Sequence, residues 1–365
     1  MTAIAPTPTP RWRAAGQALR LALIAPPAQT VPPSSLGGLE QVRWLAEGLA
    51  GNGHHVTLIG TDLAGLPPGH YAVANTDLAK GGRRATPELI DQLHAERAGE
   101  ILDQLRVDAV SDHTRAGYRP ASGHPQLMAH TLYQPIASSW LSPPARPPLA
   151  HLAGGYVAVS TYQQRSGLGL PWLAVIHPGI PFAEHPLSLD HDGLCVYLGP
   201  LQAGHGARAA LEAAHQAGRP IVLAGTRPSG EATAYAQIEL RPLLGAGDRL
   251  LERVSASERA ELLGDAHCLL GLLHYGEPSS LEVVEAMAYG TPVVTMAGTV
   301  GGELVTHGVS GLVLTDLALL ADAIERSGRL DPKEIREHAA AQFDVAVMVA
   351  AYEELFGRLL RPGGR

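Results

Sequence analysis

The sequence predicts an α/β protein with two domains, each built on a doubly wound parallel sheet. Short apolar runs of strand length alternate with amphipathic helical segments along most of the chain, which is typical of parallel sheets with helices on both faces. The chain has 365 residues, of which 45% are hydrophobic, and this length allows two separate cores. A polar stretch at residues 183–192 divides the alternation and is expected to be the linker.

We expect four segments. Residues 1–18, rich in Thr, Pro and Ala and without periodicity, predict a disordered tail. Residues 19–185 and 186–342 should form the two domains. In residues 343–365, apolar positions recur at helical spacing and predict a final amphipathic helix.

The first domain should begin with a strand, a glycine turn and a helix, at Leu21 to Ala25, Gly37-Gly38 and Leu39 onward. Two glycines let a backbone approach a diphosphate at the positive end of a helix, although a glycine pair also occurs in ordinary tight loops. After a loop at 62–84 we expect a helix at 86–105 and strands at 108–111, 126–132, 156–160 and 173–176.

The second domain repeats the alternation. Strands are expected at 194–198, 221–224, 250–254, 268–273 and 292–296, with helices at 207–217, 232–240 and 255–263. One further helix should begin at about Pro278 to Ser280, because proline is allowed in a first turn and Ser279 and Ser280 can satisfy free backbone N–H groups. Gly290 should end that helix.

Two glutamates flank the start of this last helix. Glu277 lies in the loop before it, and Glu285 lies eight positions later inside an apolar run. Because Glu285 is so close to a core, its carboxylate needs a hydrogen-bond partner. The start of the helix is a separate feature, and it attracts anions. The alternative is a capped, half-exposed helix with surface glutamates.

Composition excludes several classes of protein. The formal net charge is −8, and without a Lys and Arg cluster a nucleic-acid surface is not expected. Cys195 and Cys268 each lie in an apolar run, which favours buried thiols over a disulfide or a metal pair and suits the cytoplasm. No apolar run approaches the ~18 residues of a membrane span, and none resembles a signal peptide.

The chain also resembles a known family at Glu277-Pro278, Glu285-Ala286-Met287-Ala288 and Gly290-Thr291-Pro292-Val293-Val294. These residues resemble the E-x7-E signature of retaining GT-B glycosyltransferases, and the resemblance covers most of the chain beyond the tail. It implies two Rossmann-like domains with a cleft between them and a C-terminal helix that crosses back onto the first domain.

The resemblance implies roles for individual residues. Glu277 would contact the donor sugar and Glu285 the nucleotide ribose, while the helix start at Ser279, Ser280 and Leu281 would face the donor diphosphate. Gly37 and Gly38 would form the glycine-rich loop of the first domain. Ser279-Ser280 replaces the Phe-Gly that the family usually has.

Two family positions differ in this chain. The Arg and Lys that usually neutralise the diphosphate are replaced by Pro200 and His205, so His205, Arg208 and Arg227 are the candidate substitutes. Tyr133 stands where the family has a histidine in its first domain, and His113 and His130 are near it in sequence. Glu277, His113 and Tyr133 are therefore the candidate catalytic residues.

The predicted function is a metal-independent retaining transfer of a sugar from a nucleoside diphosphate sugar, with UDP or GDP as the nucleotide, to a small-molecule acceptor. No other cofactor is expected. Natural-product or glycoconjugate biosynthesis is the implied setting, and a homodimer is an open alternative to a monomer. The competing hypothesis is a degenerate member that binds a nucleotide sugar or a partner without glycosyl transfer, or catalyses a non-glycosidic coupling.

Overall fold

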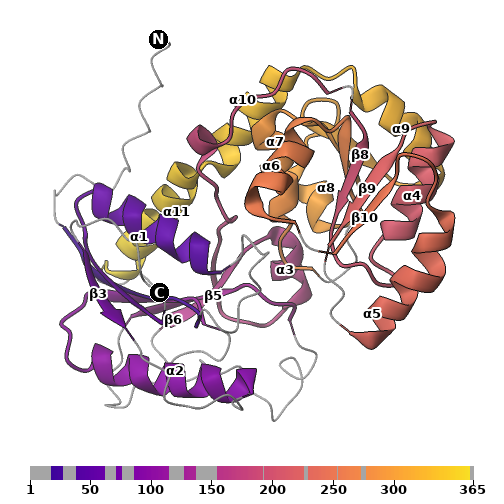
Figure 1. The fold of residues 1–365 in the computed structure, drawn as a ribbon. Helices are drawn as coiled ribbons and strands as arrows, with labels where there is room; N and C mark the ends of the chain where they lie inside the picture. Colours follow the sequence, from indigo (N-terminus) through magenta and orange to yellow (C-terminus); the bar gives the residue numbers. More distant parts are fainter. Residues whose placement is uncertain are drawn as a thin grey trace. The chain divides into compact units, whose positions relative to one another are not determined.

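The computed structural model describes residues 18–27, 38–61, 71–75, 86–114, 127–136, 154–191, 193–225, 229–252, 254–272 and 277–361. The expected tail therefore lies outside the described residues except for Ala18. Two compact units are present (Figure 1): unit 1 comprises residues 1–159, 163–179 and 345–365, and unit 2 comprises residues 160–162 and 180–344.

Unit 1 contains a seven-stranded sheet in the order β3-β2-β1-β4-β5-β6-β7. Its strands are β1 (Arg20–Ile24), β2 (His55–Gly60), β3 (Tyr71–Asn75), β4 (Ala109–Asp112), β5 (Met128–Leu132), β6 (Gly154–Ala158) and β7 (Trp172–Val175). All six neighbouring pairs are parallel. Parallel strands need crossover connections, and helices supply them.

Helices cover both faces of this sheet. One face packs against α1 (Leu39–Gly51) and α11 (Val345–Leu359), whose Leu45 and Phe356 belong to the same buried cluster. The other face packs against α2 (Pro87–Leu102), which contributes Ala98 and Leu102 (Figure 1). A short helix, α3 (Thr161–Ser166), follows β6.

Unit 2 contains a six-stranded parallel sheet in the order β10-β9-β8-β11-β12-β13. Its strands are β8 (Cys195–Leu198), β9 (Ile221–Ala224), β10 (Arg249–Leu251), β11 (Cys268–Gly271), β12 (Val293–Met296) and β13 (Gly311–Leu314). Its helices are α4 (Ala207–Gln216), α5 (Gly230–Tyr235), α6 (Ala256–Gly264), α7 (Leu281–Tyr289), α8 (Val300–Leu304), α9 (Leu320–Ser327) and α10 (Pro332–Phe343).

The helices of unit 2 also form two layers. Figure 1 shows α4 and α9 on one side of the sheet and α6, α7, α8 and α10 on the other. Leu211 of α4, Leu223 of β9 and Ile324 of α9 lie in one buried cluster. The predicted α/β fold with doubly wound parallel sheets is confirmed.

The structure corrects three of the predicted elements. Residues 71–75 form strand β3, although the sequence predicted a loop at 62–84. The helix predicted at 232–240 is α5 followed by a π-helical turn at Ala236–Leu240. The final helix is not continuous from Phe343, because Asp344 has an extended backbone between α10 and α11.

The thiols of the two cysteines are free and buried, as predicted. They are neighbours across parallel strands β8 and β11, and their Sγ atoms lie 4.0 Å apart. None of the helices among the described residues is long and apolar enough to cross a bilayer.

A buried polar contact attaches α11 to the rest of unit 1. The carboxylate of Glu353, 1% exposed, accepts hydrogen bonds at Oε1 from Asn52 Nδ2 at 3.0 Å and from His54 Nε2 at 2.9 Å. His54 Nδ1 in turn accepts from the backbone N–H of Leu19 at 3.1 Å, which fixes the neutral tautomer with the proton on Nε2. The last helix is therefore held to the start of β2 by hydrogen bonds as well as by apolar packing.

Replacing Glu353 should destabilise unit 1. In Glu353→Ala the buried Nε2–H of His54 loses its acceptor, which costs about 1–3 kcal/mol for such a group. Denaturant titration followed by tryptophan fluorescence would report on unit 1 alone, because every tryptophan of the chain falls in its ranges: Trp12, Trp44, Trp140 and Trp172. Glu354→Ala, at the exposed neighbouring position, is the control, and an equal loss in both variants would contradict the prediction.

Candidate functional site

Ligands of doubly wound sheets bind outside the carboxyl ends of the strands, where the strand order reverses. In unit 1 that reversal lies between β1 and β4, and in unit 2 it lies between β8 and β11. The helix predicted to carry Glu285, with Glu277 in the loop before it, is α7, which follows β11. The predicted donor site therefore lies at the edge of unit 2 where ligand binding is expected.

The start of α7 differs from the prediction in one respect. The helix begins at Leu281, and Ser280 occupies the N-cap position without capping a backbone N–H. Instead, the Ser280 hydroxyl donates a hydrogen bond to the carboxylate of Glu282. Gly290 ends the helix with φ of 85°, a left-handed conformation that favours glycine. The Ser280 side chain thus does not compete with an anion for the helix start.

Carboxyl groups gather near that start. Glu277 is half-buried before α7, and Glu282 lies in its first turn, where burial raises the pKa of the carboxyl. Burial, followed by the charges of Glu282 and Glu277, also raises the pKa of the Tyr197 phenol on β8. The two carboxyl groups are therefore close to the end of β8, so the site combines a helix N-terminus with acidic side chains.

The buried carboxylate of Glu285 has the hydrogen-bond partner that its position requires. Glu285 is 4% exposed, and its Oε2 accepts a hydrogen bond from Nε of Arg259 on α6. The side chains of the pair are 6% and 16% exposed, respectively. The sequence predicted the need for a partner but not its identity.

The side chain of Tyr197, on β8, holds the loop that follows this strand. The phenol donates hydrogen bonds to the backbone oxygens of His205 at 2.7 Å and Pro200 at 3.2 Å. His205 Nε2 lies 2.8 Å from the side-chain amide nitrogen of Gln202, which is the donor of that contact. Gly206 has φ of 92°, and a Cβ there would collide with the carbonyl oxygen of Leu272. This loop therefore needs a glycine and presents His205 beside α4.

Of the other predicted donor residues, the structure describes Arg208 and Gly38. The exposed guanidinium of Arg208 pairs with Glu212 at 2.8 Å and with Glu239 at 2.7 Å. Gly38 starts α1 with φ of 73° and is buried. Gly37 and Arg227 lie outside the described residues.

In unit 1, two of the predicted catalytic residues meet at the carboxyl edge of the sheet. His113 Nδ1 lies 3.1 Å from the hydroxyl of Tyr133, and its Nε2 lies 2.9 Å from Oγ of Ser111. Burial lowers the pKa of His113 to about 3, although the nearby Asp112 carboxylate opposes this. Burial likewise raises the pKa of Tyr133. At neutral pH both groups are uncharged hydrogen-bonding partners.

Sequence reasoning noted His130 as near Tyr133 but did not predict its contact with Asp112 or the approach of Tyr352. Asp112 and His130 are direct neighbours across β4 and β5, with Oδ2 3.0 Å from Nδ1. Oδ1 of Asp112 accepts hydrogen bonds from N and Oγ1 of Thr114. Tyr352 reaches the same edge from α11, and its hydroxyl lies 2.7 Å from Oγ1 of Thr131. The contact between Asp112 and His130 could have been found because both are polar residues on adjacent strands, but Tyr352 is too distant in sequence.

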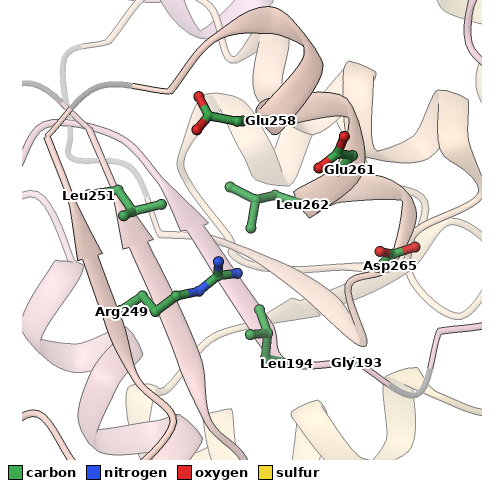
Figure 2. A pocket seen from close by; sticks show the side chains of 8 residues that line it. All are labelled: Gly193, Leu194, Arg249, Leu251, Glu258, Glu261, Leu262 and Asp265. Carbon is green, nitrogen blue, oxygen red and sulfur yellow. The ribbon is translucent and has the colours of Figure 1, made fainter.

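A pocket of about 330 Å³ is found elsewhere in unit 2 (Figure 2). It is lined by Gly193, Leu194, Arg249, Leu251, Glu258, Glu261, Leu262 and Asp265. Hydrogen bonds from Ser255 lower the pKa of Glu258 and keep it ionised. One arginine and three carboxylates line this pocket, so it does not suit a diphosphate, and no predicted donor residue lines it.

Among the described residues, no three His, Cys, Asp or Glu side chains converge in a way that could hold a metal ion.

The sequence and the structure were compared with known proteins. Residues 193–327 match a family model described as glycosyl transferases group 1. No curated protein sequence matches the chain.

Three solved structures resemble the chain over nearly its whole length. AviGT4, a glycosyltransferase involved in avilamycin A biosynthesis, is 22% identical with a TM-score of 0.67, covering 94% of this chain and 98% of its own. Sucrose-phosphate synthase from Thermosynechococcus elongatus is 18% identical with a TM-score of 0.69, covering 93% and 98%. HepE from Anabaena in complex with UDP-glucose is 17% identical with a TM-score of 0.64, covering 92% and 98%. The chain has the GT-B fold of two Rossmann-like units.

The low pKa of His113 should make the stability of unit 1 depend on pH. The unfolded chain binds a proton near pH ~6.5, whereas the folded chain resists protonation down to about pH 3. Unfolding therefore takes up a proton in this window, and the free energy of unfolding should fall by up to ~1.4 kcal/mol per pH unit as the pH is lowered through it.

Denaturant titrations between about pH 4.5 and 7, followed by tryptophan fluorescence, would measure this dependence. This range includes the pH at which the imidazole of the unfolded chain titrates and extends below it. His113→Asn should show a shallower dependence than the wild type. His55→Asn, at an exposed position on β2, is the control and should keep the wild-type slope. An unchanged slope in His113→Asn would assign the effect to another group.

Proposed function

We propose that this protein is a retaining glycosyltransferase that moves a sugar from a nucleoside diphosphate sugar to a small-molecule acceptor. The observation that carries the proposal is the family match over residues 193–327, because Glu277, Glu285 and the whole of α7 fall inside it. The UDP-glucose bound to HepE supports UDP as the nucleotide, with GDP as the alternative.

The proposed donor site surrounds the start of α7. The N-terminus of the helix, at Ser279, Ser280 and Leu281, receives the diphosphate, because backbone N–H groups and the helix dipole both favour an anion there. Glu277 contacts the hydroxyls of the sugar, and Glu285 contacts the ribose. Gly37, Gly38 and Arg227 complete the proposed set of donor-binding residues.

The proposed acceptor residues are His113 and Tyr133 in unit 1. Each is neutral at physiological pH, since burial lowers the pKa of the first and raises that of the second. Neutral donors and acceptors of hydrogen bonds suit a hydroxyl-bearing acceptor better than a charged one. This supports an acceptor whose hydroxyl group attacks the donor sugar.

The proposed reaction needs no metal. The acceptor oxygen forms a bond to the anomeric carbon on the face from which the diphosphate leaves, and the departing phosphate oxygen takes the acceptor proton. The bond between the anomeric carbon and the phosphate oxygen breaks in the same step, so the configuration at that carbon is retained. Stabilisation of the developing negative charge then depends on α7 and on the loop that carries His205.

A second candidate function is binding of a nucleotide sugar without transfer, or a non-glycosidic coupling. It is favoured by the ion pairs of Arg208 with Glu212 and Glu239, because an arginine committed to two carboxylates neutralises a diphosphate less effectively. Turnover separates the two functions.

The cellular setting is also a proposal. Two free, buried thiols support a reducing compartment, and we propose the cytoplasm. The likeness to AviGT4 supports a role in natural-product or glycoconjugate biosynthesis. A homodimer is compatible with this role.

Transfer can be tested by measuring release of nucleoside diphosphate from UDP- and GDP-sugars with a panel of hydroxyl-bearing acceptors. We expect acceptor-dependent release, and Glu277→Gln should lower kcat/KM by about 10- to 150-fold, the range for losing a hydrogen bond to a charged group. Its affinity for free UDP should stay unchanged. Glu261→Gln, exposed on α6, is the control. If the protein binds a nucleotide sugar but releases no nucleoside diphosphate with any of the acceptors, the second candidate function is favoured.

The role of His205 gives a prediction about pH. If its imidazolium replaces the missing lysine, UDP should bind most tightly at low pH, and the affinity should decline as the pH rises through the imidazole titration, which a bound anion displaces upward from ~6.5. Titrations from about pH 5.5 to 8.5, spanning that range, should show this slope in the wild type. The slope should be absent in His205→Ala and His205→Lys, and the lysine variant should bind more tightly at high pH. A slope that persists in His205→Ala, beyond what titration of the nucleotide's own phosphate explains, would remove His205 from this role.

A further inference from the structure

The ion pair between α6 and α7 engages only one of the two carboxylate oxygens of Glu285. Nε of Arg259 donates to Oε2, and the structure gives Glu285 no other hydrogen bond within the described ranges. Oε1 therefore keeps its capacity to accept. A carboxylate that is 6% exposed is poorly solvated, so a ligand hydroxyl at Oε1 would supply a charge-assisted bond that water supplies incompletely.

Arg259 also influences two ionisable neighbours of Glu285 on α7, Glu282 and Tyr289. Its guanidinium lies near two carboxyl groups one helical turn apart on α7, because it lowers the pKa of Glu282 while Glu285 raises it. Burial, the largest influence, raises the pKa of Glu282 overall. Arg259 also opposes the effect of Glu285 on Tyr289, whose phenol has a raised pKa through burial. Arg259 and Glu285 thus form a pair without net positive charge.

The chemistry of the pair points to a hydroxyl rather than a phosphate. A phosphate needs a net positive charge or backbone N–H groups, and Arg259 is already engaged by Glu285. A hydroxyl donates to a carboxylate oxygen and does not need such a charge. The fixed Nε contact also holds the carboxylate in one orientation, because it restricts rotation of the carboxylate plane.

We infer that Arg259 is a positioning residue for nucleotide selection: it holds the Glu285 carboxylate in one orientation, so that Oε1 accepts a hydrogen bond from one ribose hydroxyl of the donor. The inference rests on the proposed function, in which Glu285 meets the ribose. The arrangement makes the chain selective for ribonucleotides. The selectivity depends on Arg259, which contacts the Glu285 carboxylate and not the ligand.

The test compares ribonucleotides with deoxynucleotides. Calorimetric titration would give the dissociation constants of UDP, 2′-deoxy-UDP and 3′-deoxy-UDP, with the GDP series alongside, for the wild type and for Arg259→Gln, Arg259→Lys and Glu285→Gln. The wild type should prefer the ribonucleotide over one deoxy analogue by about 10- to 150-fold, the range for a hydrogen bond to a charged group. The weaker of the two analogues identifies the hydroxyl that is bound.

In Arg259→Gln the ribonucleotide should bind as weakly as that analogue does, while the affinity for the analogue itself stays close to the wild-type value. Glu285→Gln should behave in the same way, and Arg259→Lys should keep part of the preference because it keeps the charge without the Nε contact. Arg326→Gln, an exposed arginine on α9, is the control and should keep the full preference. Since Arg259→Gln leaves a buried carboxylate unpaired, the double variant Arg259→Gln/Glu285→Gln removes both charges and should match Glu285→Gln.

A merely structural role of Arg259 would lower the affinities for ribonucleotide and deoxynucleotide together and leave their ratio unchanged, which would overturn the inference alone. Failure of the wild type to bind either UDP or GDP would overturn the inference and the proposed function together. A ribose preference that survives in Arg259→Gln but is lost in Glu285→Gln would leave the role of Glu285 intact and remove Arg259 from it.

Discussion

Every strand pair described in the two sheets is parallel, and the position of each polar group discussed above depends on that constraint. Parallel strands all end at the same edge, so residues that follow different strands come close there regardless of their separation in sequence. Asp112 and His130 meet across β4 and β5 in this way. In unit 2 the loop after β8 and the helix after β11 are neighbours for the same reason. The helices that make the crossovers also provide the N-termini that face this edge.

Periodic apolar residues made most of the fold predictable. Residues 221–224 form β9 as expected, because a buried strand is a run of apolar residues. Gly290 ends α7 as expected, because the left-handed conformation at the end of a helix favours glycine. Strand β3 was not predicted. It is a five-residue strand paired with β2, and such a short run between turn-forming residues has no distinctive pattern.

The site was predictable only where backbone geometry determined it. The sequence predicted a helix with Glu277 in the loop before it and Glu285 inside it, and α7 has Glu285 while Glu277 precedes it. Arg259 lies 26 residues before Glu285 and joins it through tertiary packing of α6 on α7, and a contact of that kind has no periodicity to detect. The Ser280 prediction was wrong for a related reason: a serine at an N-cap can donate to a carboxylate instead of accepting from the backbone, and Glu282 provides that carboxylate. Because burial raises the pKa of Glu282, that side chain repels an approaching anion less than its sequence position suggests.

The order in which the chain is synthesised has a consequence for unit 1. That unit is discontinuous, since α11 belongs to it although the whole of unit 2 precedes α11 in sequence. On the ribosome, Asn52 and His54 have emerged some three hundred residues before Glu353, their partner, is made. Unit 2 lies almost entirely in one continuous stretch and needs nothing from the C-terminal helix for its sheet. The second half of the chain can therefore complete its core during translation, while the first half keeps an uncovered apolar face until the last helix is released.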